Sequence, residues 1–273
     1  VNDKNVLVGT IPLSVIISTT RQKKIVNLMR EAKESVHFSV DKEDVADIFR
    51  KRNLTSLAVV DNKKKLLGSI NVEDAVDVID DEAEEDFLKL AGVGEQSFYD
   101  AIVTVTKARF TWLFFNLIAA FFASFIIKNF ESTIEKLVIL AALMPVVASM
   151  GGCSGTQSLT TAVRAIAMKQ LTWSNAFRST IKEVFIGFLN GLVFSFASFF
   201  ITFFWFDDLT LSLVISISLL LNLVFGAFFG TFVPIILTRL GVDPAVASGT
   251  FVTMLTDIVG FLMFLTLATT YLI

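Results

Sequence analysis

Five apolar runs in the C-terminal part of the chain are each about long enough to cross a lipid bilayer. They cover approximately Phe110–Ile127, Leu137–Ala167, Val184–Phe206, Leu211–Leu237 and Ala245–Ile273. A bilayer core takes about 20 apolar residues per helix, because lipid cannot satisfy exposed backbone groups. Only four of the 28 phenylalanines precede residue 110, which fits a lipid-solvated composition for the rest. We therefore predict an α-helical integral membrane domain of five transmembrane helices over residues 110–273.

Basic residues beside these runs predict the orientation of the helices. Cytoplasmic connections of membrane proteins carry an excess of lysine and arginine. Such residues precede the first run, join the second to the third and join the fourth to the fifth: Lys107, Arg109, Arg164, Lys169, Arg178, Lys182 and Arg239. We expect a multi-pass protein of the cell (inner) membrane, with its N-terminal part in the cytoplasm and its C-terminus outside.

Asp257 is the only charged residue in the last apolar run. A carboxylate at bilayer depth costs at least about 2.5–3.5 kcal/mol, so such residues commonly mark ion pathways. The alternative is a carboxyl group that is protonated or hydrogen-bonded between helices. We favour a cation pathway.

The second run contains a glycine-rich stretch that is expected to break its helix. Pro145, Gly151, Gly152 and Gly155 lie there, with small polar residues and Gln157 between and after them. Irregular backbone at membrane depth is tolerated where it is buried in protein or lines a wet cavity. We expect Gly151, Gly152, Gly155 and Gln157 to line a pore, and close helix packing is the alternative. Gly226 and Gly230 in the fourth run predict packing rather than a ligand site.

The remaining chemistry excludes several functions. The chain has one Cys (Cys153) and one His (His37), too few for a disulfide framework or for Cys- or His-based zinc chemistry. The membrane half has no HExxH or GxSxG pattern, so we expect no enzyme and no nucleic-acid partner. A chloride channel is disfavoured, because the single charge in the last run is negative.

An internal repeat marks the soluble half. Val1–Leu13 matches Val60–Val72 at an offset of 59 residues, and each copy predicts a strand, a polar turn, a strand and a helix. Between the copies we expect a helix over Lys42–Asn53 and a strand over Leu57–Val60. The first copy lacks its front half, so the chain is expected to begin inside a domain. We assign residues 1–71 to an α/β region, and residues 72–109 to a connecting helix and its link to the membrane.

Val72–Leu90 predicts a long helix with an acidic surface. Eleven acidic residues lie between Glu73 and Asp100, against Lys89 as the only base. A solvated helix face is one interpretation of such a run. Carboxylate clusters are also the ligands of hard divalent cations, so we favour a cation-responsive helix.

These segments together resemble the MgtE-type magnesium channel family. The membrane signatures are Pro145–Ser158, Leu240–Ala245 and Thr256–Gly260, and the soluble repeat resembles a pair of cystathionine β-synthase-type (CBS) domains with an incomplete first copy. The resemblance implies a homodimer in the bilayer, with a pore at the subunit interface. It places hydrated magnesium at Asp257, with oxygens at Gly249 and Thr253 nearby.

The resemblance also implies regulation. Magnesium bound to the CBS region and the acidic helix would close the pore, and an adenine nucleotide is a candidate ligand of the CBS region. The residues of the acidic helix that the resemblance implies as magnesium ligands are Asp77, Asp80, Asp81, Glu82, Glu85 and Asp86. Two positions depart from the family pattern: Cys153 replaces a usual Asn, and Gly249-Thr250 replaces a usual Asn-Pro. Selectivity among divalent cations is therefore open. A secondary transporter or exchanger of magnesium and cobalt remains the alternative to a channel, and an intramembrane enzyme or receptor is disfavoured.

Overall fold

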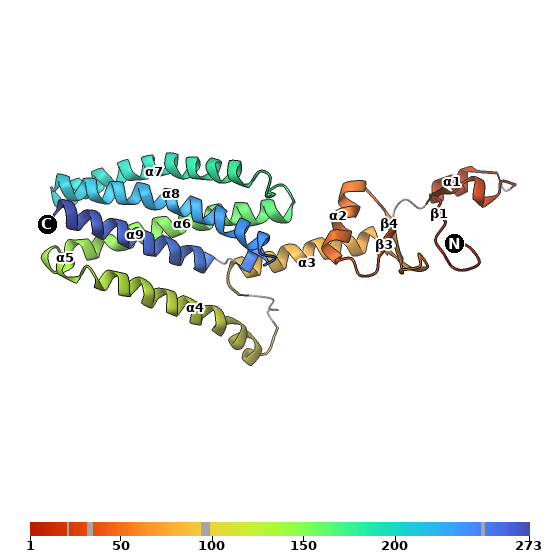
Figure 1. The fold of residues 1–273 in the computed structure, drawn as a ribbon, viewed down its shortest axis with the longest axis horizontal. Coiled ribbons are helices and arrows are strands. Elements are labelled where there is room, and N and C mark those ends of the chain that lie inside the picture. The colour runs from red at the N-terminus through yellow and green to blue at the C-terminus, as the bar shows by residue number, and fades with distance from the viewer. Residues whose placement is uncertain (21, 32–34, 94–98, 247–248) are drawn as a thin grey trace. The chain divides into compact units, whose positions relative to one another are not determined.

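The computed structural model describes residues 1–20, 22–31, 35–93, 99–246 and 249–273. The chain forms two compact units, Val1–Glu85 and Asp86–Ile273 (Figure 1).

The first unit is a small α/β structure. Its elements are β1 (Gly9–Thr10), α1 (Leu13–Ser18), η1 (Ile25–Asn27), β2 (Arg30–Glu31), β3 (Ser35–His37), α2 (Lys42–Arg52), β4 (Ser56–Val60), β5 (Leu66–Asn71) and most of α3 (Val72–Leu90). β1 pairs antiparallel with β2, whereas β4 pairs in parallel with β3 and antiparallel with β5. Phe49 of α2, Leu57 of β4 and Ala75 of α3 form the centre of its core. The predicted helix and strand between the repeats are confirmed, and their CBS-type assignment stays a prediction.

The two repeat copies form the same hairpin turn. The Asp61 carboxylate accepts hydrogen bonds from the backbone N–H groups of Lys63 and Lys65, at 2.8 Å each. In the first copy, the Asn2 side chain accepts from the N–H groups of Lys4 and Val6, at 3.1 and 2.9 Å. These positions differ by the same 59 residues as the sequence repeat. The bond from Lys65 contributes most to lowering the pKa of Asp61. The repeat is therefore present in the structure as well as in the sequence.

The second unit consists mainly of long helices. They are α4 (Ile102–Lys128), α5 (Glu131–Lys136), α6 (Ile139–Ala167), α7 (Ala176–Phe206), α8 (Leu209–Arg239), η2 (Pro244–Val246) and α9 (Gly249–Tyr271). Among the described residues, α4, α6, α7, α8 and α9 are long and apolar enough to cross a membrane. This confirms the five predicted segments. The helices α4 and α7 begin before their apolar runs, because a helix can continue beyond the lipid boundary.

α6 corrects the prediction of a broken second segment. It is one continuous helix that runs through Pro145 and all three glycines. The glycines are needed for close packing instead. A Cβ at Gly155 would lie 2.6 Å from the Val252 side chain of α9, and a Cβ at Gly226 of α8 would lie 2.6 Å from the Gly151 carbonyl. The packing role predicted for Gly226 and Gly230 is confirmed, since a Cβ at Gly230 would collide with the Gly155 carbonyl.

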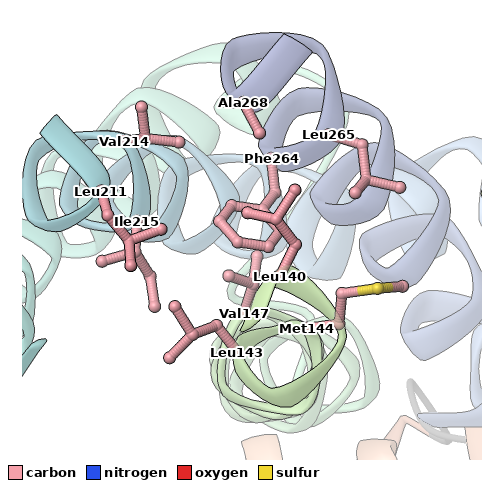
Figure 2. Packing of buried hydrophobic residues seen from close by; sticks show 10 residues of the cluster. All are labelled: Leu140, Leu143, Met144, Val147, Leu211, Val214, Ile215, Phe264, Leu265 and Ala268. Atoms are coloured by element: carbon pink, nitrogen blue, oxygen red, sulfur yellow. The ribbon is translucent and has the colours of Figure 1, made fainter. Parts of the chain in front are cut away.

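α6, α8 and α9 share the largest buried apolar cluster of this unit. Figure 2 shows Phe264 of α9 pointing toward Leu140 and Val147 of α6, with Ile215 of α8 beside them. Phe264, Leu140 and Val147 are fully buried. At the same end of the unit, Thr133 of α5 is hydrogen-bonded to Thr269 of α9 at 2.9 Å. These contacts fix α6 and α9 side by side, which positions the candidate site.

Candidate functional site

An open cleft of about 690 Å³ lies between α6 and α9. Its lining residues are Pro145, Ala148, Ser149, Gly152, Cys153, Thr156, Gln157, Thr253 and Asp257. The α6 residues recur at spacings of three and four, so they form one face of the helix. From Pro145 to Gln157 this face extends about 18 Å at 1.5 Å per residue, more than half of a bilayer core of about 30 Å. The face carries hydroxyl, amide and thiol groups and no cationic residue.

Among the described residues that line the cleft, only Asp257 is charged. Thr253 precedes it by four residues on α9, so both side chains lie on one face of the helix. The Asp257 carboxylate is half-buried, and within the described ranges it has neither a hydrogen bond nor an ion pair. Of the two alternatives for Asp257, a hydrogen bond between helices is therefore not found among the described residues, and a protonated carboxyl group stays a prediction. The carboxylate thus lines the cleft without a partner among the described residues.

The other predicted pore residues divide into two groups. Gly152 and Gln157 line the cleft beside Asp257 and Thr253. Gly151 and Gly155 are buried outside the cleft lining, where Gly151 allows α8 to approach and Gly155 allows α8 and α9 to approach. Gly249 is the first residue of α9, and a Cβ there would lie 3.6 Å from the Thr156 hydroxyl. Gly249 is thus close to the cleft wall without being part of it.

Asn222 of α8 is an important polar residue that sequence reasoning missed. It is fully buried, and its Nδ2 donates a hydrogen bond to the Val147 carbonyl of α6 at 2.8 Å. The available signal was that Asn222 is the only amide side chain in the run Leu211–Leu237. Polar side chains in such runs commonly form hydrogen bonds between membrane helices.

The acidic residues of α3 have a different environment from Asp257. Asp77, Asp80 and Asp81 are exposed to solvent. Glu82 forms an ion pair with Lys42 of α2 at 2.8 Å, and this contact raises the pKa of Lys42. The counter-charge for the run thus comes partly from a helix distant in sequence.

The remaining candidate ligands of α3 also interact with other groups. Glu85 and Asp86 both take part in further interactions. Glu95, another member of the acidic run, lies outside the described residues. Across the described part of the chain, no group of three or more His, Cys, Asp or Glu residues is close enough to hold a metal ion.

Comparisons with known proteins match this architecture. A family model, MgtE, described as a divalent cation transporter, matches residues 144–267, which include the cleft residues from Ala148 to Asp257. The chain is also 34% identical over 272 residues to the magnesium transporter MgtE of Enterococcus faecalis, and 32% identical over 273 residues to that of Bacillus subtilis. These matches confirm the resemblance of this chain to the MgtE family.

The alignment with these MgtE relatives includes all of this chain, which spans 60% of the length of each relative. The MgtE of Thermus thermophilus is 33% identical over 271 residues, with 98% of this chain and 60% of the relative covered. A crystal structure of the soluble part of a magnesium transporter is 40% identical over 30% of this chain and 32% of that chain, with a TM-score of 0.30.

Proposed function

We propose that this chain transports magnesium across the cell membrane along the cleft between α6 and α9. The observation that carries the proposal is the Asp257 carboxylate, which has no protein partner among the described residues and lies among hydroxyl and amide groups. A carboxylate at membrane depth is costly, and a passing cation would compensate its charge. The names of the relatives, each a magnesium transporter MgtE, support magnesium as that cation.

The composition of the cleft suits a hydrated magnesium ion. Magnesium dehydrates reluctantly and is usually bound by one or two carboxylates with several retained waters. The hydroxyl groups of Ser149, Thr156 and Thr253 can accept hydrogen bonds from such waters or donate to them. Asp257 supplies a negative charge. Binding through water needs space rather than a tight ring of protein ligands, which fits a cleft of about 690 Å³.

A homodimer in the bilayer would complete the pathway. One chain provides one carboxylate and an open cleft between two helices. A second copy facing it would close the cleft and add a second Asp257, so that two negative charges balance one divalent ion. The orientation of the helices follows the basic residues, with the soluble unit in the cytoplasm and the C-terminus outside.

Regulation by cytoplasmic magnesium is the further part of the proposal. Magnesium bound near Asp77, Asp80, Asp81, Glu82, Glu85 and Asp86 would neutralise their mutual repulsion and favour a closed state. When magnesium is scarce, repulsion would favour an open state, because a ligand shifts a two-state equilibrium by its differential affinity. The exposure of Asp77, Asp80 and Asp81 supports their availability to ions. Binding of an adenine nucleotide by the CBS-type region stays a prediction.

Magnesium flux into liposomes tests the transport proposal. The protein should admit magnesium into vesicles that contain a magnesium-sensitive dye, and Asp257→Ala should abolish this influx while leaving a folded protein. Asp207→Asn is the matched control, because Asp207 has a left-handed conformation at the end of α7, which asparagine tolerates. Wild-type influx in the Asp257→Ala protein would disprove the assignment of the pathway.

Two further measurements define the transport. Manganese, calcium and cobalt as competitors would determine selectivity, which Cys153 and Gly249 leave open. Recordings in planar bilayers distinguish a channel from a secondary transporter or exchanger: discrete current steps are expected for a channel, and their absence during magnesium flux would favour the carrier.

A further inference from the structure

Asn222 lies in the helix packing directly behind the cleft. Its side chain is 0% exposed, and one end of the amide donates to the Val147 carbonyl of α6. The other end, Oδ1, is a buried polar atom with no hydrogen-bond partner in the described part of the chain. A half-satisfied amide in an apolar interior is costly, whereas leucine would fill similar space without that cost. Space filling alone therefore does not account for an asparagine here.

Two glycines hold the Asn222 amide from opposite helices. A Cβ on Gly151 of α6 would collide with the amide nitrogen, and a Cβ on Gly260 of α9 would lie 2.5 Å from the same atom. The amide thus fills the space between the backbones of α6 and α9. Because its nitrogen is hydrogen-bonded to α6, it acts as a spacer of fixed length rather than as a loose filler.

The spacer lies next to the cleft on both helices. Gly151 is followed by Gly152, which lines the cleft, and a Cβ on Gly152 would lie 3.3 Å from the Thr253 side chain. Gly260 follows Asp257 by three residues on α9, less than one helical turn. A change in the separation of Gly151 and Gly260 would therefore move Asp257 relative to the hydroxyl groups of α6.

We propose that Asn222 is a positioning residue that sets the separation of α6 and α9 at the cleft, and thereby its discrimination between magnesium and larger divalent cations. This inference rests on the proposed transport function. Selection between magnesium and calcium depends on the size, ligand number and rigidity of a site. A buried spacer that does not contact the ion affects the size and the rigidity of the site.

Ser154 provides a matched control for the Asn222 hydrogen bond. Its hydroxyl donates to the Leu223 carbonyl of α8 at 2.9 Å, so this bond joins the same two helices as the bond from Asn222 to Val147. A Cβ on Gly260 meets Asn222 and no atom of Ser154 among its nearest neighbours. Ser154→Ala therefore removes a comparable bond between α6 and α8 without changing the spacer between α6 and α9.

The test compares magnesium and calcium influx into liposomes for the wild type, Asn222→Leu and Ser154→Ala. Loss of folded protein lowers the magnesium and calcium fluxes in proportion. A change in the separation of α6 and α9 alters their ratio. We expect Asn222→Leu to lower the magnesium-to-calcium ratio by about tenfold, a typical effect of residues that support metal ligands. Ser154→Ala should keep the wild-type ratio. Equal ratios in all three proteins would overturn the proposal.

If Asn222→Leu does not fold, Gly260→Ala provides a second test of the spacer. The added methyl group presses on Asn222, so the ratio should fall, and the double variant Gly260→Ala/Asn222→Ser should recover part of it. No recovery in a folded double variant would count against a spacer.

A second measurement is independent of transport. The rate at which a thiol reagent modifies Cys153 in the cleft should change in Asn222→Leu and remain unchanged in Ser154→Ala. If the wild type carries no magnesium, the proposed function fails, and the Cys153 rates still test the spacer. Identical rates in all proteins would overturn the role of Asn222 without affecting the transport proposal.

Discussion

The carboxylates of this chain occupy two contrasting environments. Asp257 is the single charge of a cleft in the membrane unit, and it has no partner within the described ranges. On α3 many carboxylates are exposed to water, and Glu82 is paired with Lys42. A carboxylate in lipid is costly and requires an explanation, whereas an exposed acidic run is stable as a solvated surface. The same functional group is thus far more informative about function at Asp257 than on α3.

The largest difference in magnesium influx is expected between neutralising one carboxylate in the cleft and neutralising three on α3. Asp257→Asn should lower magnesium influx at least about tenfold, because it removes the charge that compensates the ion. The triple variant Asp77→Asn/Asp80→Asn/Asp81→Asn should retain influx at low magnesium, because these residues do not line the cleft. Flux into dye-loaded liposomes measures both. A larger loss in the triple variant than in Asp257→Asn would reverse the assigned roles.

Modification of Cys153 should have the next largest effect. Cys153 is the only cysteine of the chain and lines the cleft, so a charged thiol reagent can react there without background. Attachment of a positively charged group should inhibit magnesium influx several-fold through repulsion of the cation. Cys153→Ser should transport magnesium and resist the reagent. Full influx after complete modification, verified by mass spectrometry, would exclude the α6 face as part of the pathway.

The membrane unit shows which features the sequence could predict. The number of membrane helices followed from the apolar runs, because lipid requires long uninterrupted helices. The continuity of α6 could not be read from its glycines. Glycine weakens a helix in water, yet on α6 the close approach of α8 and α9 depends on these same residues. Local propensity was therefore overridden by tertiary packing.

The candidate site was predictable only in part, because its helix faces depend on tertiary contacts. Asp257 was identifiable alone, because a single charge in an apolar run is rare. Which side of α6 faces the cleft depends on its contacts, so Gly151 and Gly152 could not be separated before the structure placed α8 and α9. Asn222 and the pair of Lys42 with Glu82 join segments distant in sequence. Such contacts leave no local pattern.

Neutralising the acidic residues of α3 is expected to have a smaller effect. If α3 responds to cations, millimolar magnesium should slow proteolysis of the soluble unit in the wild type, and the triple variant should lose this protection. The expected physical cause is that bound cations remove repulsion between like charges on neighbouring turns. Limited proteolysis followed by gel electrophoresis measures it. Unchanged protection in the triple variant would mean that these residues are only a solvated face.

The smallest effect is expected at Lys42. Its ammonium group pairs with Glu82, and so it competes with any cation near that carboxylate. Lys42→Gln should lower the magnesium concentration for half-maximal protection by about twofold, since exposed ion pairs are weak and screened. Lys51→Gln is a control, because Lys51 pairs with Asp47 within α2. Equal shifts in both variants would indicate a general charge effect.

If a cation binds at Asp257 inside the cleft, it should protect the nearby Cys153 from a thiol reagent. The rate of Cys153 modification should be measured with and without magnesium in the wild type and in Asp257→Asn. We predict that magnesium slows the reaction in the wild type and has no effect in Asp257→Asn. If magnesium leaves the rate unchanged in the wild type, or slows it equally in Asp257→Asn, magnesium does not bind at Asp257 in the cleft.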